Sequence, residues 1–126
     1  MHIEHIAIWT RDLEGLKAFY ETFFEACAGA KYVNAERGFE SYFLIFPTGA
    51  RLEIMRVKGL TQTGIPDRPG YAHVAFSVGS QAAVDALTAR LADACYRVVD
   101  GPRHTGDGYY ESCVLDPDGN RIEITI

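Results

Sequence analysis

The chain has 126 residues, which is the usual size of a single domain and enough to bury one hydrophobic core. Its 12 basic and 17 acidic residues are interspersed and give a net charge of -5, which argues against a basic surface that would bind nucleic acid. The first residues lack the basic and apolar segments of a signal peptide, and no apolar run is long enough to span a bilayer, so we expect a cytoplasmic protein that binds neither membrane nor nucleic acid.

The first half of the chain reads as one strand, one helix and three further strands. Residues 2–10 are rich in isoleucine, as a buried strand would be, and Asp12 then supplies an N-cap for a helix that runs to about Cys27. Apolar side chains recur at three- and four-residue steps along this helix, which predicts a buried face. Turn signals separate three strand-like runs at residues 31–36, 39–46 and 51–57.

The second half repeats this order after a linker. Residues 58–70 contain two prolines and three glycines without a clear period, which predicts the linker. A strand is then expected at 71–78, a helix from the Ser80 cap to about Ala94, and strands near 96–102, 109–115 and 121–126. Each half is therefore a βαβββ module.

The repeat is also visible as pairs of similar sequence motifs. Pro47-Thr-Gly-Ala-Arg-Leu-Glu53-Ile returns as Pro117-Asp-Gly-Asn-Arg-Ile-Glu123-Ile, and His5-Ile-Ala-Ile returns as His73-Val-Ala-Phe. Modules 1–57 and 71–126 are each too small to bury their own sheet face. We therefore expect a single α+β domain over residues 1–126, in which the two modules form a curved mixed sheet around a cavity.

Each module carries one histidine and one glutamate on strand positions that face away from the apolar side chains. Successive strand residues point to opposite faces, so His5 and His73 lie opposite the neighbouring isoleucine and valine, as do Glu53 and Glu123. Two imidazoles and two carboxylates suit one divalent ion of Zn, Ni, Co, Mn or Fe, with open positions for substrate. The repeat thus predicts a metal site formed by His5, Glu53, His73 and Glu123.

Other side chains are candidates for contact with a substrate. Trp9 shares the face of His5, where it would either stack on a planar or apolar substrate or pack in the core. Met55 and Cys113 would supply apolar walls, and Arg103 and Tyr109 lie in or after a glycine-rich loop that would close over the cavity.

The number and spacing of the cysteines do not indicate disulfide bonds. Cys27, Cys95 and Cys113 are odd in number and widely spaced, unlike a set of disulfides or a paired zinc motif. We expect reduced and mostly buried thiols.

Several motifs together resemble a known family. They are His5-Ile-Ala-Ile with a following Asp-Leu helix start and Phe19-Tyr20, then Arg51-Leu-Glu53, His73-Val-Ala-Phe-Ser-Val and Asp116-Pro-Asp-Gly-Asn-Arg-Ile-Glu123. Over nearly its whole length the chain is similar to the vicinal oxygen chelate superfamily, the group of glyoxalase I, bleomycin-resistance proteins and extradiol dioxygenases. The resemblance implies a glyoxalase-like fold and a homodimer, with the metal ligands at the same four positions that the repeat predicts.

The resemblance also implies a reaction. In glyoxalase I the metal binds the substrate oxygens, and a carboxylate at the position of Glu123 moves a proton next to a carbonyl. This implies a metal-dependent lyase or isomerase acting on a small oxygenated substrate, with Glu123 as the catalytic residue. The arginine and asparagine that anchor glutathione in glyoxalase I are replaced by Trp9 and Val57, which argues against glutathione as cosubstrate.

Other activities of the group stay open. Fosfomycin-resistance transferases use two histidines and one glutamate, and their tyrosine falls on Cys113, while extradiol dioxygenases use a two-histidine, one-carboxylate iron site. The fourth ligand argues against both. A drug-binding protein of the bleomycin-resistance type is the alternative from another functional class, and its members usually lack the four ligands.

Overall fold

The computed structural model describes residues 4–60, 71–106 and 108–126, and the chain forms two compact units, Met1–Gln62 and Thr63–Ile126. Most of the predicted linker, residues 61–70, lies outside the described residues. Within the described part, no helix is long and apolar enough to cross a membrane.

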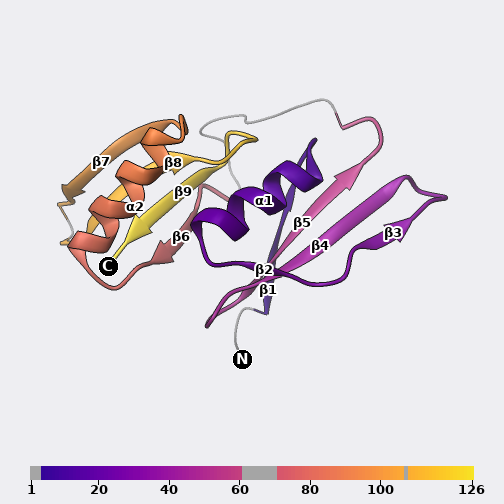
Figure 1. The fold of residues 1–126 in the computed structure, drawn as a ribbon, viewed down its shortest axis with the longest axis horizontal. Helices are drawn as coiled ribbons and strands as arrows, with labels where there is room; N and C mark the ends of the chain where they lie inside the picture. Colours follow the sequence, from indigo (N-terminus) through magenta and orange to yellow (C-terminus); the bar gives the residue numbers. More distant parts are fainter. Residues whose placement is uncertain (1–3, 61–70, 107) are drawn as a thin grey trace. The chain divides into compact units, whose positions relative to one another are not determined.

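The first unit is a mixed sheet with one long helix (Figure 1). Its strands are hydrogen-bonded in the order β1-β5-β4-β2, and β3 also pairs with β4. β1 runs parallel to β5, whereas the other pairs are antiparallel. The elements are β1 (His5–Trp9), α1 (Leu13–Phe23), β2 (Cys27–Ala28), β3 (Tyr32–Asn34), β4 (Phe39–Ile45) and β5 (Arg51–Val57).

The second unit follows the same plan. Its strand order is β6-β9-β8-β7, with β6 parallel to β9 and the other pairs antiparallel. The predicted α+β class with mixed sheets is therefore confirmed. The elements are β6 (Val74–Ser77), α2 (Gln81–Asp93), β7 (Val98–His104), β8 (Tyr110–Leu115) and β9 (Arg121–Thr125).

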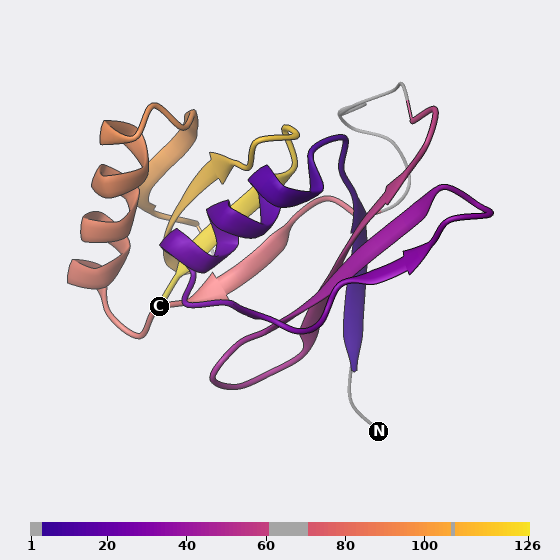
Figure 2. The same cartoon turned by 45° about the vertical axis from the view of Figure 1, so that its right-hand side comes forward.

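In each unit the helix packs on one face of the sheet, and the core lies between them; in the first unit, drawn in indigo to magenta in Figure 2, α1 packs on β4, β5 and β2. α2 packs on β7, β8 and β9 in the same way. Strand alternation sends one set of side chains to the helix and leaves the other set on the open face. The buried apolar residues include Leu13, Leu16, Phe19, Tyr20, Leu44, Leu52 and Ile54 in the first unit and Val84, Leu91, Val114, Ile122 and Ile124 in the second.

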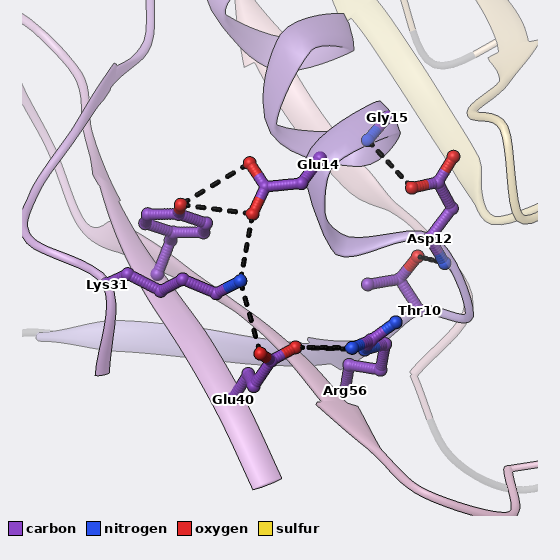
Figure 3. A network of polar contacts seen from close by, with 8 residues as sticks. Thr10, Asp12, Glu14, Gly15, Lys31, Glu40 and Arg56 are labelled. Atoms are coloured by element: carbon purple, nitrogen blue, oxygen red, sulfur yellow. Dashed lines mark hydrogen bonds and ion pairs between the residues drawn. The ribbon is translucent and has the colours of Figure 1, made fainter. Parts of the chain in front are cut away.

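A polar network ties α1 to its sheet (Figure 3). The Lys31 ammonium lies 3.0 Å from a Glu14 carboxylate oxygen on the helix and 3.2 Å from Glu40 on β4. Arg56 on β5 donates to the same Glu40 at 2.6 Å, and the Tyr42 hydroxyl donates to Glu14 at 3.1 Å. The network fixes the helix side of the sheet, opposite the predicted metal ligands.

Helix α1 ends at Phe23, so the predicted end near Cys27 is wrong. Glu25 takes a left-handed conformation with φ 56°, and the Ala26 N–H bonds back to the Tyr20 carbonyl at 3.3 Å. A left-handed residue closes a helix and is usually glycine, so the sequence predicted that the helix continues to about Cys27, just before Gly29. The chain then forms the short strand β2, which the sequence did not predict.

Helix α2 ends in the same way, at another residue that is not glycine. Cys95 has φ 66°, and the Tyr96 N–H donates to the Leu91 carbonyl at 3.0 Å. Because the left-handed conformation costs a residue with a Cβ about 1–2 kcal/mol, Cys95→Gly is expected to raise the free energy of unfolding by about 1 kcal/mol. Urea unfolding followed by circular dichroism measures the gain, and Cys27→Gly on β2 is the control, which should give none.

A buried hydroxyl pair joins α2 to β8. Thr88 has a single proton, which it donates to the Val84 carbonyl at 2.7 Å, so the Ser112 hydroxyl donates to the Thr88 oxygen at 2.6 Å. Ser112→Ala therefore leaves Thr88 satisfied, whereas Thr88→Val leaves a buried donor without its partner. We expect losses of about 1 and about 1–3 kcal/mol respectively in urea unfolding. Equal losses would contradict this assignment of donors.

Candidate metal site

In the first unit, the two predicted ligands lie on the face of the sheet that points away from α1. His5 pairs in register with Arg51, and Glu53 follows two residues later on β5, so all three share that face. Leu52 and Ile54 point the other way and are 2% and 0% exposed. The predicted division of the strand into an apolar and a ligand-bearing face is therefore seen.

His5 is held in place by three neighbours. Its Nδ1 bonds to the Glu4 carboxylate, which also pairs with the Arg51 guanidinium. The Phe43 ring meets the imidazole edge-on at 5.3 Å between centroids, and Arg51 lies 4.1 Å over the same ring. The hydrogen bond from His5, helped by Arg51, lowers the pKa of the Glu4 carboxyl below its ordinary value. With Nδ1 bonded to a carboxylate, Nε2 is the nitrogen left for a ligand, as in metal-bound histidines.

Glu53 is half-buried on the same face, with Phe43 beside it in register on β4. Among the described residues, its carboxylate has no hydrogen-bond or ion-pair partner. A half-buried carboxylate with no protein partner has lost part of its hydration, and no protein contact compensates for that loss. A bound cation would compensate for it.

The second unit brings its two predicted ligands together. The Nε2 of His73 lies 3.2 Å from a carboxylate oxygen of Glu123, with the two side chains 41% and 25% exposed. His73 stands two residues before Ala75, which pairs with Glu123 in register. Cys113 on β8 pairs with Glu123 from the other side.

These donors fit a divalent metal by geometry and by chemistry. Nitrogen and oxygen ligands bind such ions at about 2.0–2.2 Å, which places two donors of one ion about 3 Å apart. The His73–Glu123 separation of 3.2 Å agrees with that value. Each unit carries one imidazole and one carboxylate, and no group of three His, Cys, Asp or Glu is gathered within the part of the chain that the structure describes.

Trp9 is 47% exposed and lies on the open face of the sheet, not in the core between the sheet and α1. It pairs in register with Met55, and the Phe39 ring meets its indole edge-on at 6.2 Å. The structure therefore brings the predicted substrate residues Trp9 and Met55 together on the open face, at the end of the sheet away from His5.

Arg103 lies outside the predicted loop, whereas Tyr109 follows the glycine-rich loop and its contact with a substrate stays a prediction. Arg103 belongs to strand β7 rather than to a loop, and its guanidinium lies 2.5 Å from the Asp100 carboxylate. Tyr109 is 53% exposed, and its carbonyl accepts from the Thr105 N–H at 2.8 Å. The sequence predicted that this strand ends at residue 102, and β7 continues two residues further, to His104.

All three cysteines are free, but Cys27 and Cys95 are exposed, so the prediction of mostly buried thiols is wrong for two of them. Cys113 is half-buried beside Glu123. Burial, followed by the charge of Glu123, raises the pKa of the Cys113 thiol. Cys113 is therefore a neutral neighbour of Glu123, and its role as an apolar wall for a substrate stays a prediction.

Two hollows open in the first unit. The smaller, about 180 Å³, is lined by Trp9, Tyr32, Asn34, Arg37, Phe39 and Val57. A larger one of about 460 Å³ adjoins it and shares Asn34, Phe39 and Val57. Of these lining residues, sequence reasoning singled out only Trp9 and Val57.

The residues of the site that were not predicted are only weakly indicated by the sequence. Phe39 lies four residues before Phe43, so strand alternation places both on one face, but only the register of β3 with β4 brings Tyr32 beside them. Glu4 precedes His5 directly and would not be expected to reach it from the opposite side of a strand.

Comparison with known proteins identifies the fold. The model of the Glyoxalase/Bleomycin resistance protein/Dioxygenase superfamily matches residues 2–124. The uncharacterized protein PA2024 of Pseudomonas aeruginosa is 32% identical over 128 residues, with 98% of this chain and 86% of that protein covered.

Solved structures of other proteins have the same fold. The glyoxylase/bleomycin resistance protein/dioxygenase domain from Frankia sp. EAN1pec superposes with a TM-score of 0.88 at 20% identity, over 100% of this chain and 97% of that one. The trypanothione-dependent glyoxalase I of Leishmania major superposes with a TM-score of 0.79 at 23% identity, over 99% of this chain and 86% of that one. The chain therefore belongs to the Glyoxalase/Bleomycin resistance protein/Dioxygenase superfamily.

Proposed function

We propose that the protein is a metal-dependent lyase or isomerase that moves a proton next to a carbonyl group of a small oxygenated substrate. The observation that carries the proposal is the 3.2 Å approach of His73 to Glu123, in which a potential base stands at a metal-ligand position. His5 and Glu53 would complete a set of two nitrogen and two oxygen donors for one ion of Zn, Ni, Co, Mn or Fe.

A bound divalent ion acts as a Lewis acid that stabilises negative charge developing on substrate oxygens. The protein residues have separate tasks. The Glu4 carboxylate and the Phe43 ring orient the His5 imidazole, and Arg51 in turn holds Glu4. The half-buried Cys113 lies beside Glu123 in register and is an uncharged neighbour of that carboxylate.

Glu123 is the proposed base. Its carboxylate takes the proton from the carbon next to the carbonyl and returns a proton to the neighbouring carbon, so the product has the same composition as the substrate and no oxidant is needed. The acidity of such a C–H group rises when the adjacent oxygen is stabilised as an anion. Proton transfer by a positioned side chain contributes about 10²–10⁴-fold to such rates.

Glutathione is not part of the proposal. Trp9 and Val57 line an aromatic hollow at the place where the family's tripeptide anchors would stand. Neither side chain binds the charged ends of a tripeptide.

Metal content tests the ligand set. Protein purified without chelator is analysed by elemental mass spectrometry and is expected to hold one divalent ion per chain. If the two His/Glu pairs acted separately, two ions per chain would bind, and if the residues were unrelated to metal, none would bind. Either result would overturn the proposal.

Proton exchange tests the chemistry. Metal-loaded protein is incubated in D₂O with hydroxyacetone, lactaldehyde, or the hemithioacetals of methylglyoxal with 2-mercaptoethanol and with glutathione. Proton NMR is expected to show deuterium entering next to the carbonyl of at least one compound, and chelator-treated protein is the control. Exchange with none of them, or equal exchange after chelation, would reject the proposed activity.

We also propose that the protein is a homodimer, because each βαβββ module leaves one face of its sheet open and family members exchange or pair such modules. Sedimentation velocity at 10 µM is expected to give the mass of two chains, about twice the 14.0 kDa of one. A single 14.0 kDa species would contradict it.

A further inference from the structure

The smaller hollow of the first unit lies on the same sheet face as the predicted ligands. Trp9 ends β1 and Val57 ends β5, whereas Glu53 lies two residues before Met55, the register partner of Trp9. A strand rises about 3.3 Å per residue, so the Trp9 position is about 7 Å from Glu53 along the sheet. A substrate held near Glu53 would reach the hollow with a short extension.

The walls of the hollow are aromatic edges and faces. Phe39 meets Trp9 at 87° with 6.2 Å between centroids, and Tyr32 meets the same Phe39 at 62° and 6.0 Å. Trp9 and Tyr32 remain 47% and 55% exposed. Large aromatic surfaces left open around a concave site favour a flat apolar guest.

One cation stands at this hollow. In the part of the chain that the structure describes, the Arg37 guanidinium has neither an ion pair nor a hydrogen bond. The Arg37 N–H donates to the Asn34 side-chain oxygen at 3.1 Å, which fixes the turn that carries the arginine. An unpaired guanidinium on a fixed turn is suited to bind a carboxylate through two parallel hydrogen bonds.

From these observations we infer that the hollow binds a single planar ring bearing a carboxylate. The volume of about 180 Å³ suits one ring, since a cavity of about 150 Å³ accepts benzene. The ring lies among Trp9, Tyr32 and Phe39, and its carboxylate pairs with Arg37. The inference rests on the proposed function in one respect, namely that this ring is the far end of the substrate whose oxygens lie near Glu53.

The test uses the intrinsic fluorescence of the full chain, because Trp9 is its single tryptophan. Chelator-treated protein is titrated with benzoate, and cyclohexanecarboxylate, benzyl alcohol and acetate are titrated in parallel. Benzoate is expected to change the fluorescence saturably and to bind at least about tenfold more tightly than each of the other three. Calorimetry confirms the affinity independently of the fluorophore.

Variants assign the contacts. Arg37→Gln is expected to lower the affinity for benzoate about tenfold and to leave the affinity for benzyl alcohol unchanged, because only the charged partner of the carboxylate is lost. Tyr32→Leu should weaken both ligands. Arg97→Gln, the same change at an exposed residue of the second unit, is the control and should change neither.

Three results would overturn the inference. They are a linear fluorescence change without saturation, equal affinity for benzoate and acetate, or benzoate binding that Arg37→Gln leaves intact. Because the titration is made without metal, failure of the metal site would leave a positive result standing. Conversely, one ion per chain with no benzoate binding would reject the ring pocket and keep the proposed metal chemistry.

Discussion

Glu123→Gln is expected to lower proton exchange at the substrate carbon by about 10²–10⁴-fold, the usual contribution of a positioned base. The amide has the shape of the carboxylate and can still accept a hydrogen bond from His73, so the fold should be retained. It cannot take a proton near neutral pH, and its neutral oxygen is a poorer metal ligand. We expect metal affinity to fall at least about tenfold as well.

Metal-saturated assays separate the two effects. Exchange is measured by NMR at a metal concentration that saturates the variant, so any remaining loss belongs to proton transfer. Glu53→Gln should lower the metal affinity by a similar factor. Once saturated with metal, this variant should retain more exchange activity than Glu123→Gln, because it removes a ligand and not the base. Glu36→Gln, at an exposed turn, is the matched control. If Glu123→Gln and Glu53→Gln behaved alike at saturating metal, Glu123 would not be the base.

Strand alternation and the internal repeat predicted the parts of the fold that depend on local pattern. β5 occupies residues 51–57 as expected, and the Ser80 side chain caps α2 by accepting from the Ala83 N–H at 3.2 Å. Glu53 and Glu123 lie on the face opposite the buried isoleucines because a period of two leaves no other choice once those isoleucines are in the core.

Features that depend on an unusual backbone were not predicted. Glu25 follows α1 in a conformation that glycine normally takes, so the sequence does not mark the end of that helix. The end of α2 at Asp93 agrees with the predicted end near Ala94, although the left-handed Cys95 was not expected. Arg103 lies in β7, which extends two residues beyond the predicted strand end at residue 102. Local propensity gave way in each case to pairing and packing with the rest of the unit.

In the candidate site, too, the sequence predicted only part of the arrangement. The sequence predicted one site formed by two histidines and two glutamates, and the structure shows a contact between two of these residues, His73 and Glu123. In the other module, His5 contacts Glu4 and Phe43 instead, although the register is the same, since Ala7 pairs with Glu53 as Ala75 pairs with Glu123. The modules differ at Glu4, because Ala72 stands at the equivalent place before His73. The repeat therefore predicts the face on which each ligand lies and not its contact.

Asp116→Ala is expected to lower the free energy of unfolding by about 2–4 kcal/mol. The carboxylate is 4% exposed and holds the turn before β9. It accepts from the Asp118 N–H at 3.0 Å, the Asn120 N–H at 2.8 Å and the Asn120 side-chain amide at 2.8 Å. Alanine would leave these donors without their acceptor, and unmade bonds at a buried site cost more than made ones contribute.

Urea unfolding followed by far-UV circular dichroism measures the loss, with Asp93→Ala at the exposed end of α2 as a control that should change stability by less than about 0.5 kcal/mol. Asp116→Asn keeps one acceptor oxygen and should lose an intermediate amount. Because Glu123 is the third residue of β9, the turn also sets the register of the proposed base. Metal affinity should therefore fall in Asp116→Ala even under conditions where the protein is fully folded, whereas a turn that only adds stability would leave metal affinity unchanged.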